Sequence, residues 1–323
     1  MLYFTKHSFY FNLLPPNAYI NFGDSAATAH KLFSHQTTAE HLVIWPKDAR
    51  QSEELPAIMK SMDPVIAFNK ERWEELSASN VEYSVPRLDL SKETARQMID
   101  PEGQLEKIEH TKVLCLAAGG GQQSAAFGIL GANVTVFDLS ENQLAKDRLA
   151  AAHYRINIKT IQGDMQDLSA FTPESFDIVW LAHSINFVPS ASAVIGGIAR
   201  ICKVGGRVRI NFTNPYVHGA WDCPSGNGFL ISQSYIDGNE IRPMDPYWTF
   251  TDPDGNCRKI EGPKEYRHSL STIINRLIAN GFRLKGLWEK IGTEPNPEVG
   301  SWEHFKTVAP PWLTIWAQKH REY

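Results

Sequence analysis

Short apolar runs alternate with longer amphipathic stretches through the middle and the end of this 323-residue chain. The apolar runs have the length of buried strands, and the stretches between them repeat apolar residues at helical spacing. Strands are predicted at residues 113–117, 134–137, 158–161, 176–181, 207–212, 283–289 and 313–318, and helices at residues 122–130, 141–153, 191–202 and 269–280. This alternation predicts an α/β fold with a mainly parallel sheet and helices on both faces.

The start of the chain is less regular. Apolar spacing predicts a helix over residues 65–77, and Ser91 is placed to cap a second helix that runs to Met98. Tyr83 lies in the predicted loop between them. Residues 1–64 follow no clear pattern, and they are compatible with a cap over a ligand or with a dimer contact.

Three glycines follow the first predicted strand, within the run Val113–Gly121. Glycines without a Cβ allow a sharp turn and the close approach of a ligand to the backbone. Because a helix is predicted to begin next, the glycines lie at a helix N-terminus with unpaired amide groups. The second strand ends at Asp138, where a carboxylate can accept hydrogen bonds from both hydroxyls of a ribose. These features favour an adenosine-containing cofactor.

The dinucleotide fingerprint would place a third small residue at position 124, where this chain has Ser124. A nicotinamide-dependent oxidoreductase is one alternative, because it would explain Gly119 and Asp138, although the third glycine is missing. A non-catalytic module that binds the cofactor is another.

Five segments, in order, resemble the motifs of class I S-adenosylmethionine-dependent methyltransferases. They are Val113–Gly121, Val136–Ser140, Gly163–Leu168, Phe176–Trp180 and Ile201–Arg207. The chain departs from the family pattern at two positions. Ala117 stands where the family usually has its first glycine, and Cys115 where it often has an acidic residue.

The resemblance implies a seven-stranded, Rossmann-like, doubly wound sheet whose last strand is antiparallel. It divides the chain into an N-terminal extension and helical cap, residues 1–110, and a methyltransferase domain, residues 111–323. An insertion at about residues 214–267 follows the fifth strand. The expected activity is transfer of a methyl group from S-adenosylmethionine to a small-molecule acceptor by in-line displacement, with S-adenosylhomocysteine as the other product.

Cofactor contacts are expected from glycine-loop, strand-end and cap residues. They are Ala117, Gly119, Gly121, Asp138, Leu139, Gln143, Gly163, Asp164, Met165, Ala182, His183 and Tyr83. The resemblance implies that Asp164, together with the backbone of Met165, binds the adenine amino group.

A hydroxyl acceptor would require a general base. The candidate catalytic residues are His183 at the end of the fourth strand, His218 after the fifth, and His268 before the next helix. Packing at a helix start is the alternative for His268.

The insertion is rich in aromatic residues, namely Tyr216, Trp221, Tyr235, Tyr247, Trp248 and Tyr266. They could line an apolar acceptor chamber, or form a small satellite core or a dimer contact. The run Tyr247–Phe250 is expected to pair with Arg258–Ile260 as a hairpin.

Composition narrows the partners. A net charge of −4, without a basic run, argues against nucleic acid as the acceptor. The four cysteines form no Cys-x-x-Cys pair, so free thiols in the cytoplasm are expected and no metal site is predicted. The longest apolar runs are too short for a membrane span. A homodimer is compatible with the sequence.

Overall fold

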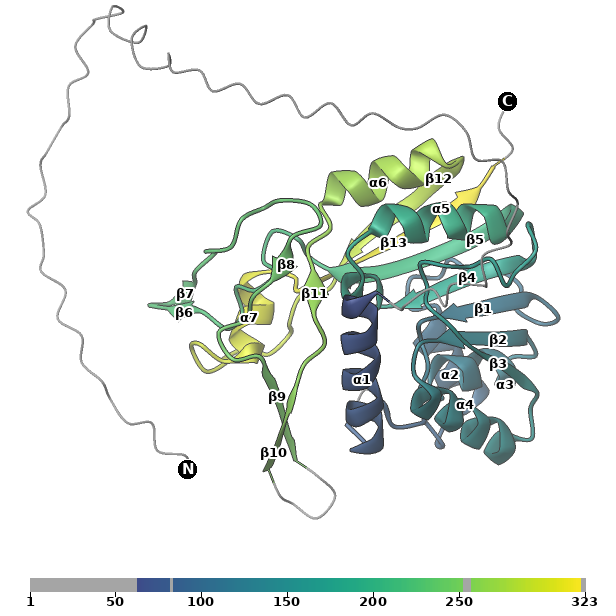
Figure 1. Cartoon of the computed structure of the whole chain (residues 1–323), viewed down its shortest axis with the longest axis horizontal. Helices are drawn as coiled ribbons and strands as arrows, with labels where there is room; N and C mark the ends of the chain where they lie inside the picture. Colours follow the sequence, from purple (N-terminus) through teal and green to yellow (C-terminus); the bar gives the residue numbers. More distant parts are fainter. Residues whose placement is uncertain (1–62, 82–83, 252–256, 321–323) are drawn as a thin grey trace, which may run out of the picture. The chain divides into compact units, whose positions relative to one another are not determined.

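Residues 63–81, 84–251 and 257–320 are described by a computed structural model of the protein (Figure 1). They belong to one unit, Lys60–Tyr323. The helices are α1 (Pro64–Ala78), α2 (Lys92–Ile99), α3 (Gln123–Ile129), α4 (Glu141–Tyr154), α5 (Ala191–Ile201), α6 (Leu270–Ala279) and α7 (Trp302–Val308), with the 3-10 turn η2 (Ile185–Phe187). The strands of the main sheet are β1 (Lys112–Leu116), β2 (Asn133–Asp138), β3 (Ile158–Gln162), β4 (Phe176–Ala182), β5 (Cys202–Thr213), β12 (Phe282–Glu289) and β13 (Trp312–Lys319).

The main sheet has the strand order β12-β13-β5-β4-β1-β2-β3. β1 runs parallel to β2 and β4, and the parallel pairing continues to β3 on one side and β5 on the other. β13 lies antiparallel between β5 and β12. The predicted seven-stranded, mainly parallel sheet with an antiparallel last strand is confirmed. The strand order changes direction between β1 and β4, which is where ligands bind in such sheets.

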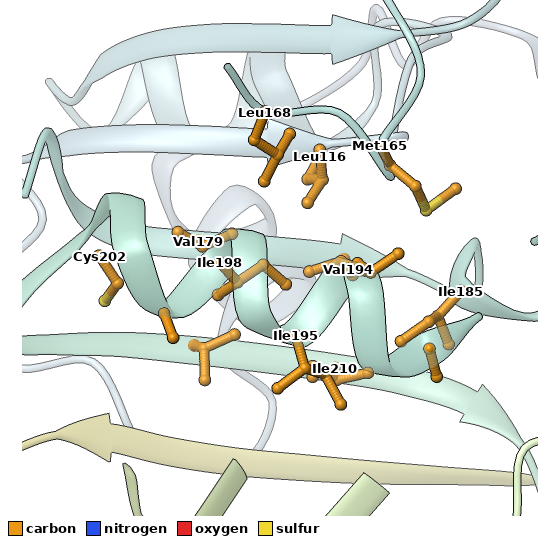
Figure 2. Close-up of a cluster of buried hydrophobic side chains, with 14 of the residues drawn as sticks. Leu116, Met165, Leu168, Val179, Ile185, Val194, Ile195, Ile198, Cys202 and Ile210 are labelled. Atoms are coloured by element: carbon orange, nitrogen blue, oxygen red, sulfur yellow. The ribbon is translucent and has the colours of Figure 1, made fainter. Parts of the chain in front are cut away.

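Alternate residues of each central strand enter separate cores on the two faces of the sheet. Leu114 and Leu116 face a core that α5 and α6 cover, whereas Val113 and Cys115 face a second core under α2, α3 and α4. Figure 2 shows the first core, with Ile195 of α5 beside Ile210 of β5. Both faces are therefore buried, which explains why these strands are continuously apolar.

Serine side chains fix the starts of most helices. The serine oxygen accepts a hydrogen bond from the amide three residues later, which satisfies one of the unpaired amides of the first turn. The capping serines are Ser91, Ser140, Ser190, Ser269 and Ser301. The predicted caps at Ser91 and Ser269 are confirmed.

The insertion leaves the sheet after β5 and returns at α6. It contains three two-stranded pairs, formed by β6 (Pro224–Ser225) with β7 (Gly228–Phe229), β8 (Glu240–Ile241) with β11 (Glu265–Tyr266), and β9 (Tyr247–Thr251) with β10 (Cys257–Glu261). The predicted hairpin is confirmed, with Phe250 opposite Arg258. Its turn lies outside the described residues. Helix α7 was not predicted, and only Phe305 of its seven residues is buried.

Helix α1 joins the insertion to the segment that follows β4. The buried Asn69 side chain donates from Nδ2 to the carbonyls of Phe187 and Lys264, at 2.8 and 3.0 Å, and its Oδ1 accepts from the Lys264 amide at 2.7 Å. Trp73 packs edge-on against both Phe187 and Trp248. One amide side chain therefore holds three segments together.

Candidate functional site

The glycine loop, Asp138 and His183 follow strands that end at the same edge of the sheet. Leu116 at the end of β1 is level with Phe137 of β2 and with Leu181 of β4. The residues that come next are therefore close in space. Gly163 joins them from β3, because its amide donates to the Asp138 carbonyl at 2.9 Å.

Ala117 adopts a glycine-like backbone conformation. Its φ angle of 46° lies in the left-handed region, and its amide donates to the Phe137 carbonyl at 2.7 Å. A residue with a Cβ is strained there. The chain therefore keeps the shape of the turn although it has alanine at a position that favours glycine.

Asp138 is tied to the glycine loop. Its Oδ2 accepts a hydrogen bond from the Gly119 amide at 2.9 Å, and its Oδ1 accepts from the Ser140 amide at 2.9 Å. Burial raises the pKa of Asp138 to about 6, although these amides act in the opposite direction. A Cβ on Gly119 would lie 2.7 Å from Cβ of Gln143, so only glycine allows the loop to lie this close.

A second buried carboxylate, which sequence analysis missed, holds the rest of the loop. Asp147 of α4 accepts from the amides of Gly120 and Gly121, at 3.1 Å each, and from the Ser124 hydroxyl. Burial raises its pKa to about 7. Its spacing three residues after the buried Leu144 was the signal available, because that spacing places both residues on one helix face.

These contacts test which cofactor suits the loop. Three successive amides, from Gly119 to Gly121, donate to carboxylates of the chain itself. Two buried acidic groups would repel a pyrophosphate, whereas they suit a cofactor that carries a sulfonium and an ammonium group. The residues present therefore fit S-adenosylmethionine better than a dinucleotide.

The predicted adenine contacts lie beside Asp138. Asp164 is half-buried, and its carboxylate accepts from the Gln166 amide at 2.9 Å and from the Gln166 side chain at 3.3 Å. Met165 is buried in the core under α5. A Cβ on Gly163 would overlap the Phe137 ring at 2.2 Å, so glycine is required there. Their roles toward adenine stay a prediction.

The other predicted cofactor residues are in mixed positions. Leu139 and Ala182 are half-buried against the two cores. Gln143 is buried on α4, and its Oε1 accepts from the Ser77 hydroxyl of α1 at 3.4 Å. Tyr83 lies outside the described residues. Their contacts with cofactor also stay predictions.

Helix α1 docks onto α4 beside the predicted site. The Glu74 carboxylate of α1 accepts from the amides of Glu141 and Asn142, at 2.7 and 3.0 Å. Those amides are in the first turn of α4, where a negative charge is also favourable for the helix dipole. Sequence analysis missed this cap, because Glu74 lies 67 residues before Glu141.

His183 follows β4 at the same edge of the sheet as the glycine loop, and its φ angle of 58° lies in the left-handed region. Its ring packs edge-on against Trp312 at 5.6 Å, and its Nε2 lies 3.2 Å from the Thr213 hydroxyl. Its Nδ1 is buried without a partner among residues that the structure describes. Burial lowers the pKa of His183 to about 4, so the ring is neutral at physiological pH.

His218 and His268 differ in what their rings contact. His218 Nε2 lies 2.8 Å from Glu265 Oε2. His268 is fully buried, and its Nε2 lies 3.0 Å from the carbonyls of both Ile185 and Val188. Because a carbonyl only accepts, Nε2 of His268 carries a proton, and burial lowers the pKa of this histidine. The carbonyl contacts give His268 a structural role, and its catalytic role is untested.

The aromatic residues of the insertion do not gather in one place. Trp248 joins a small satellite cluster with Leu76, Val81 and Ile260. Tyr216 stacks on Tyr235 at 4.9 Å, and both rings are exposed. For Trp248 the structure supports the satellite core rather than an enclosed chamber.

A second series of rings leads from His183 to the insertion. Trp312 of β13 lies 5.5 Å from Trp302 of α7, which lies 5.9 Å from Trp221. The side of His183 away from the glycine loop is therefore rich in aromatic surface.

No group of three or more metal-binding side chains occurs within residues 63–81, 84–251 and 257–320. The same residues include no helix that is both apolar and long enough to cross a membrane. The four cysteines are unbridged.

The strand order, with the antiparallel strand β13 between β5 and β12, defines the class I methyltransferase architecture. The structure of a putative S-adenosylmethionine-dependent methyltransferase from Listeria monocytogenes is similar to this one. The match covers 71% of this chain and 99% of that chain, with a TM-score of 0.51 and 20% identity. One from Mesorhizobium loti covers 72% of this chain and 100% of its own, with a TM-score of 0.51 and 18% identity. These similarities show the fold.

Sequence comparison shows the family. Residues 114–210 match the family described as methyltransferase domain. The uncharacterized methyltransferase YbaJ of Bacillus subtilis (strain 168) is 32% identical over 245 residues, which are 72% of this chain and 92% of that protein. The chain therefore belongs to the class I S-adenosylmethionine-dependent methyltransferases.

A second relative matches a shorter stretch of the chain. The ubiquinone biosynthesis O-methyltransferase of Pseudomonas syringae pv. tomato is 35% identical over 103 residues, 32% of this chain and 44% of that protein.

Proposed function

We propose that the protein transfers a methyl group from S-adenosylmethionine to a small-molecule acceptor by in-line displacement. The main support for this proposal is that two buried carboxylates, Asp138 and Asp147, accept hydrogen bonds from the amides of the glycine loop. Bound S-adenosylmethionine supplies a methyl group on a positively charged sulfur. The acceptor would lie on the side of His183, where aromatic rings offer apolar surface.

The chain's own part in this chemistry is to position the two reactants and to exclude water. Asp138 would exchange its contact with an amide for the ribose hydroxyls, through hydrogen bonds worth about 1.5–3 kcal/mol each. Asp164 and the Met165 backbone would bind adenine. Holding acceptor and methyl donor in line can supply roughly 7–11 kcal/mol of the barrier. A general base is needed where the acceptor is a hydroxyl.

Binding and turnover test the proposal separately. Isothermal titration calorimetry should show micromolar-scale binding of S-adenosylhomocysteine and no comparable binding of NAD. Preference for NAD would instead support the oxidoreductase alternative. Turnover is tested with S-adenosylmethionine that carries an isotopically labelled methyl group, added with a bacterial small-molecule extract. Binding without labelled products would favour the non-catalytic module.

The division of the chain at residue 110, a homodimer and a cytoplasmic location remain predictions from the sequence. Size-exclusion chromatography with light scattering tests the dimer.

A further inference from the structure

A histidine and a glutamate form a hydrogen-bonded pair inside the insertion. His218 lies in the turn after β5, and its side chain is 3% exposed. Its Nε2 is 2.8 Å from Oε2 of Glu265, on β11. Because an ionised carboxylate only accepts, Nε2 carries a proton, and in the neutral ring the lone pair is then on Nδ1. That Nδ1 is buried and has no partner in the described part of the chain.

The surrounding residues hold this pair in place. Arg267, which is also buried, donates from Nη2 to the His218 carbonyl at 2.7 Å. Hydrogen bonds therefore fix His218 at its backbone carbonyl and at Nε2 of its ring. A carboxylate that orients a histidine and leaves the second nitrogen unpaired is the arrangement of an activated base.

Two further polar atoms near the pair have no partner. Oδ2 of Asp222 and Nδ1 of His183 are buried and unpaired within the described residues. Burial and the charge of Glu265 raise the pKa of Asp222 to about 6, and His183 also interacts electrostatically with Glu265 and His218. Buried polar atoms are rarely left without a partner. Oδ2 of Asp222 and Nδ1 of the neutral His218 ring are acceptors, so these two atoms suit a ligand that brings a hydrogen-bond donor.

We propose that His218 is the general base of the methyl transfer, that Glu265 is its positioning residue, and that the acceptor carries a hydroxyl on a planar, apolar ring. This inference rests on the proposed function. A neutral amine can attack without losing a proton first, whereas a hydroxyl needs a base. The edge-on rings of Phe187 and Trp312 beside His183 supply surface for a planar ring.

The proton and electron balance is complete. The acceptor oxygen forms a bond to the methyl carbon, and the carbon–sulfur bond breaks with its electron pair left on sulfur. The hydroxyl proton passes to Nδ1 of His218, and the Glu265 carboxylate stabilises the imidazolium. The proton then leaves to solvent.

The test uses 4-nitrocatechol, whose ionised form absorbs visible light, with the full-length protein saturated with S-adenosylhomocysteine. The wild type should bind the probe and lower its apparent pKa. His218→Gln should reduce the ratio of ionised to neutral bound probe about tenfold, which is one pKa unit. Glu265→Gln should shift the pH profile part of the way. The titratable or charged groups around the ring are His183, Asp222, Glu265, Arg267 and His268.

His110→Gln is the matched control, because the side chain of His110 is 79% exposed. This variant should leave the pH profile unchanged. Calorimetry with S-adenosylhomocysteine reports on folding and on the proposed function. Unaltered affinity in His218→Gln with an unaltered ionised fraction would overturn the base assignment alone. Failure of the wild type to bind the probe, while it binds S-adenosylhomocysteine, would also overturn this inference and leave the proposed function intact. Failure to bind S-adenosylhomocysteine would overturn the proposed function itself.

Discussion

Oδ2 of Asp138 accepts a hydrogen bond of 2.9 Å from the amide of Gly119, so the carboxylate expected to bind ribose also holds the glycine loop. A change at Asp138 therefore acts on the cofactor site in two ways. It removes a charged acceptor and loosens the loop.

Asp138→Asn should weaken S-adenosylhomocysteine binding by about tenfold or more, since hydrogen bonds to charged groups are worth about 1.5–3 kcal/mol. In the wild type, affinity should also fall as the pH drops through about 6, because the pKa of Asp138 is raised to about 6 by burial and the neutral acid accepts poorly. Calorimetry across this range measures both effects. Equal affinities for wild type and variant at neutral pH would show that the ribose lies elsewhere.

Asp147→Ala should destabilise the protein by about 2–4 kcal/mol, because two buried amides and the Ser124 hydroxyl lose their acceptor. Ser124→Ala removes one of these donors and should cost less. Urea denaturation provides the comparison, with S-adenosylhomocysteine affinity as a second readout.

The effect should depend on pH. Burial raises the pKa of Asp147 from 3.8 to about 7, so the folded state holds this proton more tightly than the unfolded state. The contribution of Asp147 to stability is therefore fully present below 3.8 and declines as the pH rises through about 7. The difference between wild type and Asp147→Ala should shrink across that window. A difference that grows with pH would contradict this assignment.

Ala117→Gly should stabilise the protein by up to about 1.6 kcal/mol. Relief of a left-handed alanine gains about 1–2 kcal/mol, and the greater freedom of glycine in the unfolded chain offsets about 0.4–1 kcal/mol. Ala118→Gly is the matched control and should be destabilising, because Ala118 is buried and is not among the residues with positive φ. The same change in stability for both variants would argue against strain at Ala117.

Glu74→Ala should cost about 1–2 kcal/mol, since the first turn of α4 loses its cap from α1. Glu71→Ala provides a control on the same helix, where an exposed glutamate pairs with Arg72. That variant should stay within about 0.5 kcal/mol of wild type in urea denaturation. Equal losses would mean that α1 is sensitive to any substitution.

The sequence predicted those parts of the fold that a repeating pattern encodes. The central strands β1 and β4 are nearly continuous apolar runs, and the serine caps at Ser91 and Ser269 are local signals. Strand ends also located Gly119, Asp138 and His183 at one edge, because parallel strands bring their carboxyl ends together.

Contacts between distant segments could not be predicted in this way. Glu74 meets α4 from 67 residues away, and Glu265 meets His218 from 47 residues away. An acidic residue on an exposed helix and one in a hairpin-rich segment have no local feature that distinguishes them from solvated charges. Only the folded chain brings them to a helix end and to a buried ring.

Asn69 links α1 to the insertion, which matters for any exchange of the insertion between relatives. Its amide is shared by α1, by the segment after β4 and by Lys264 in the insertion, segments that are 118 and 195 residues away from it. Because both partners at Lys264 are backbone groups, a chimera with another relative's insertion would keep this anchor of α1 only where the new backbone follows the same path. The insertion and α1 are therefore coupled, and an exchange of the insertion between relatives should include α1.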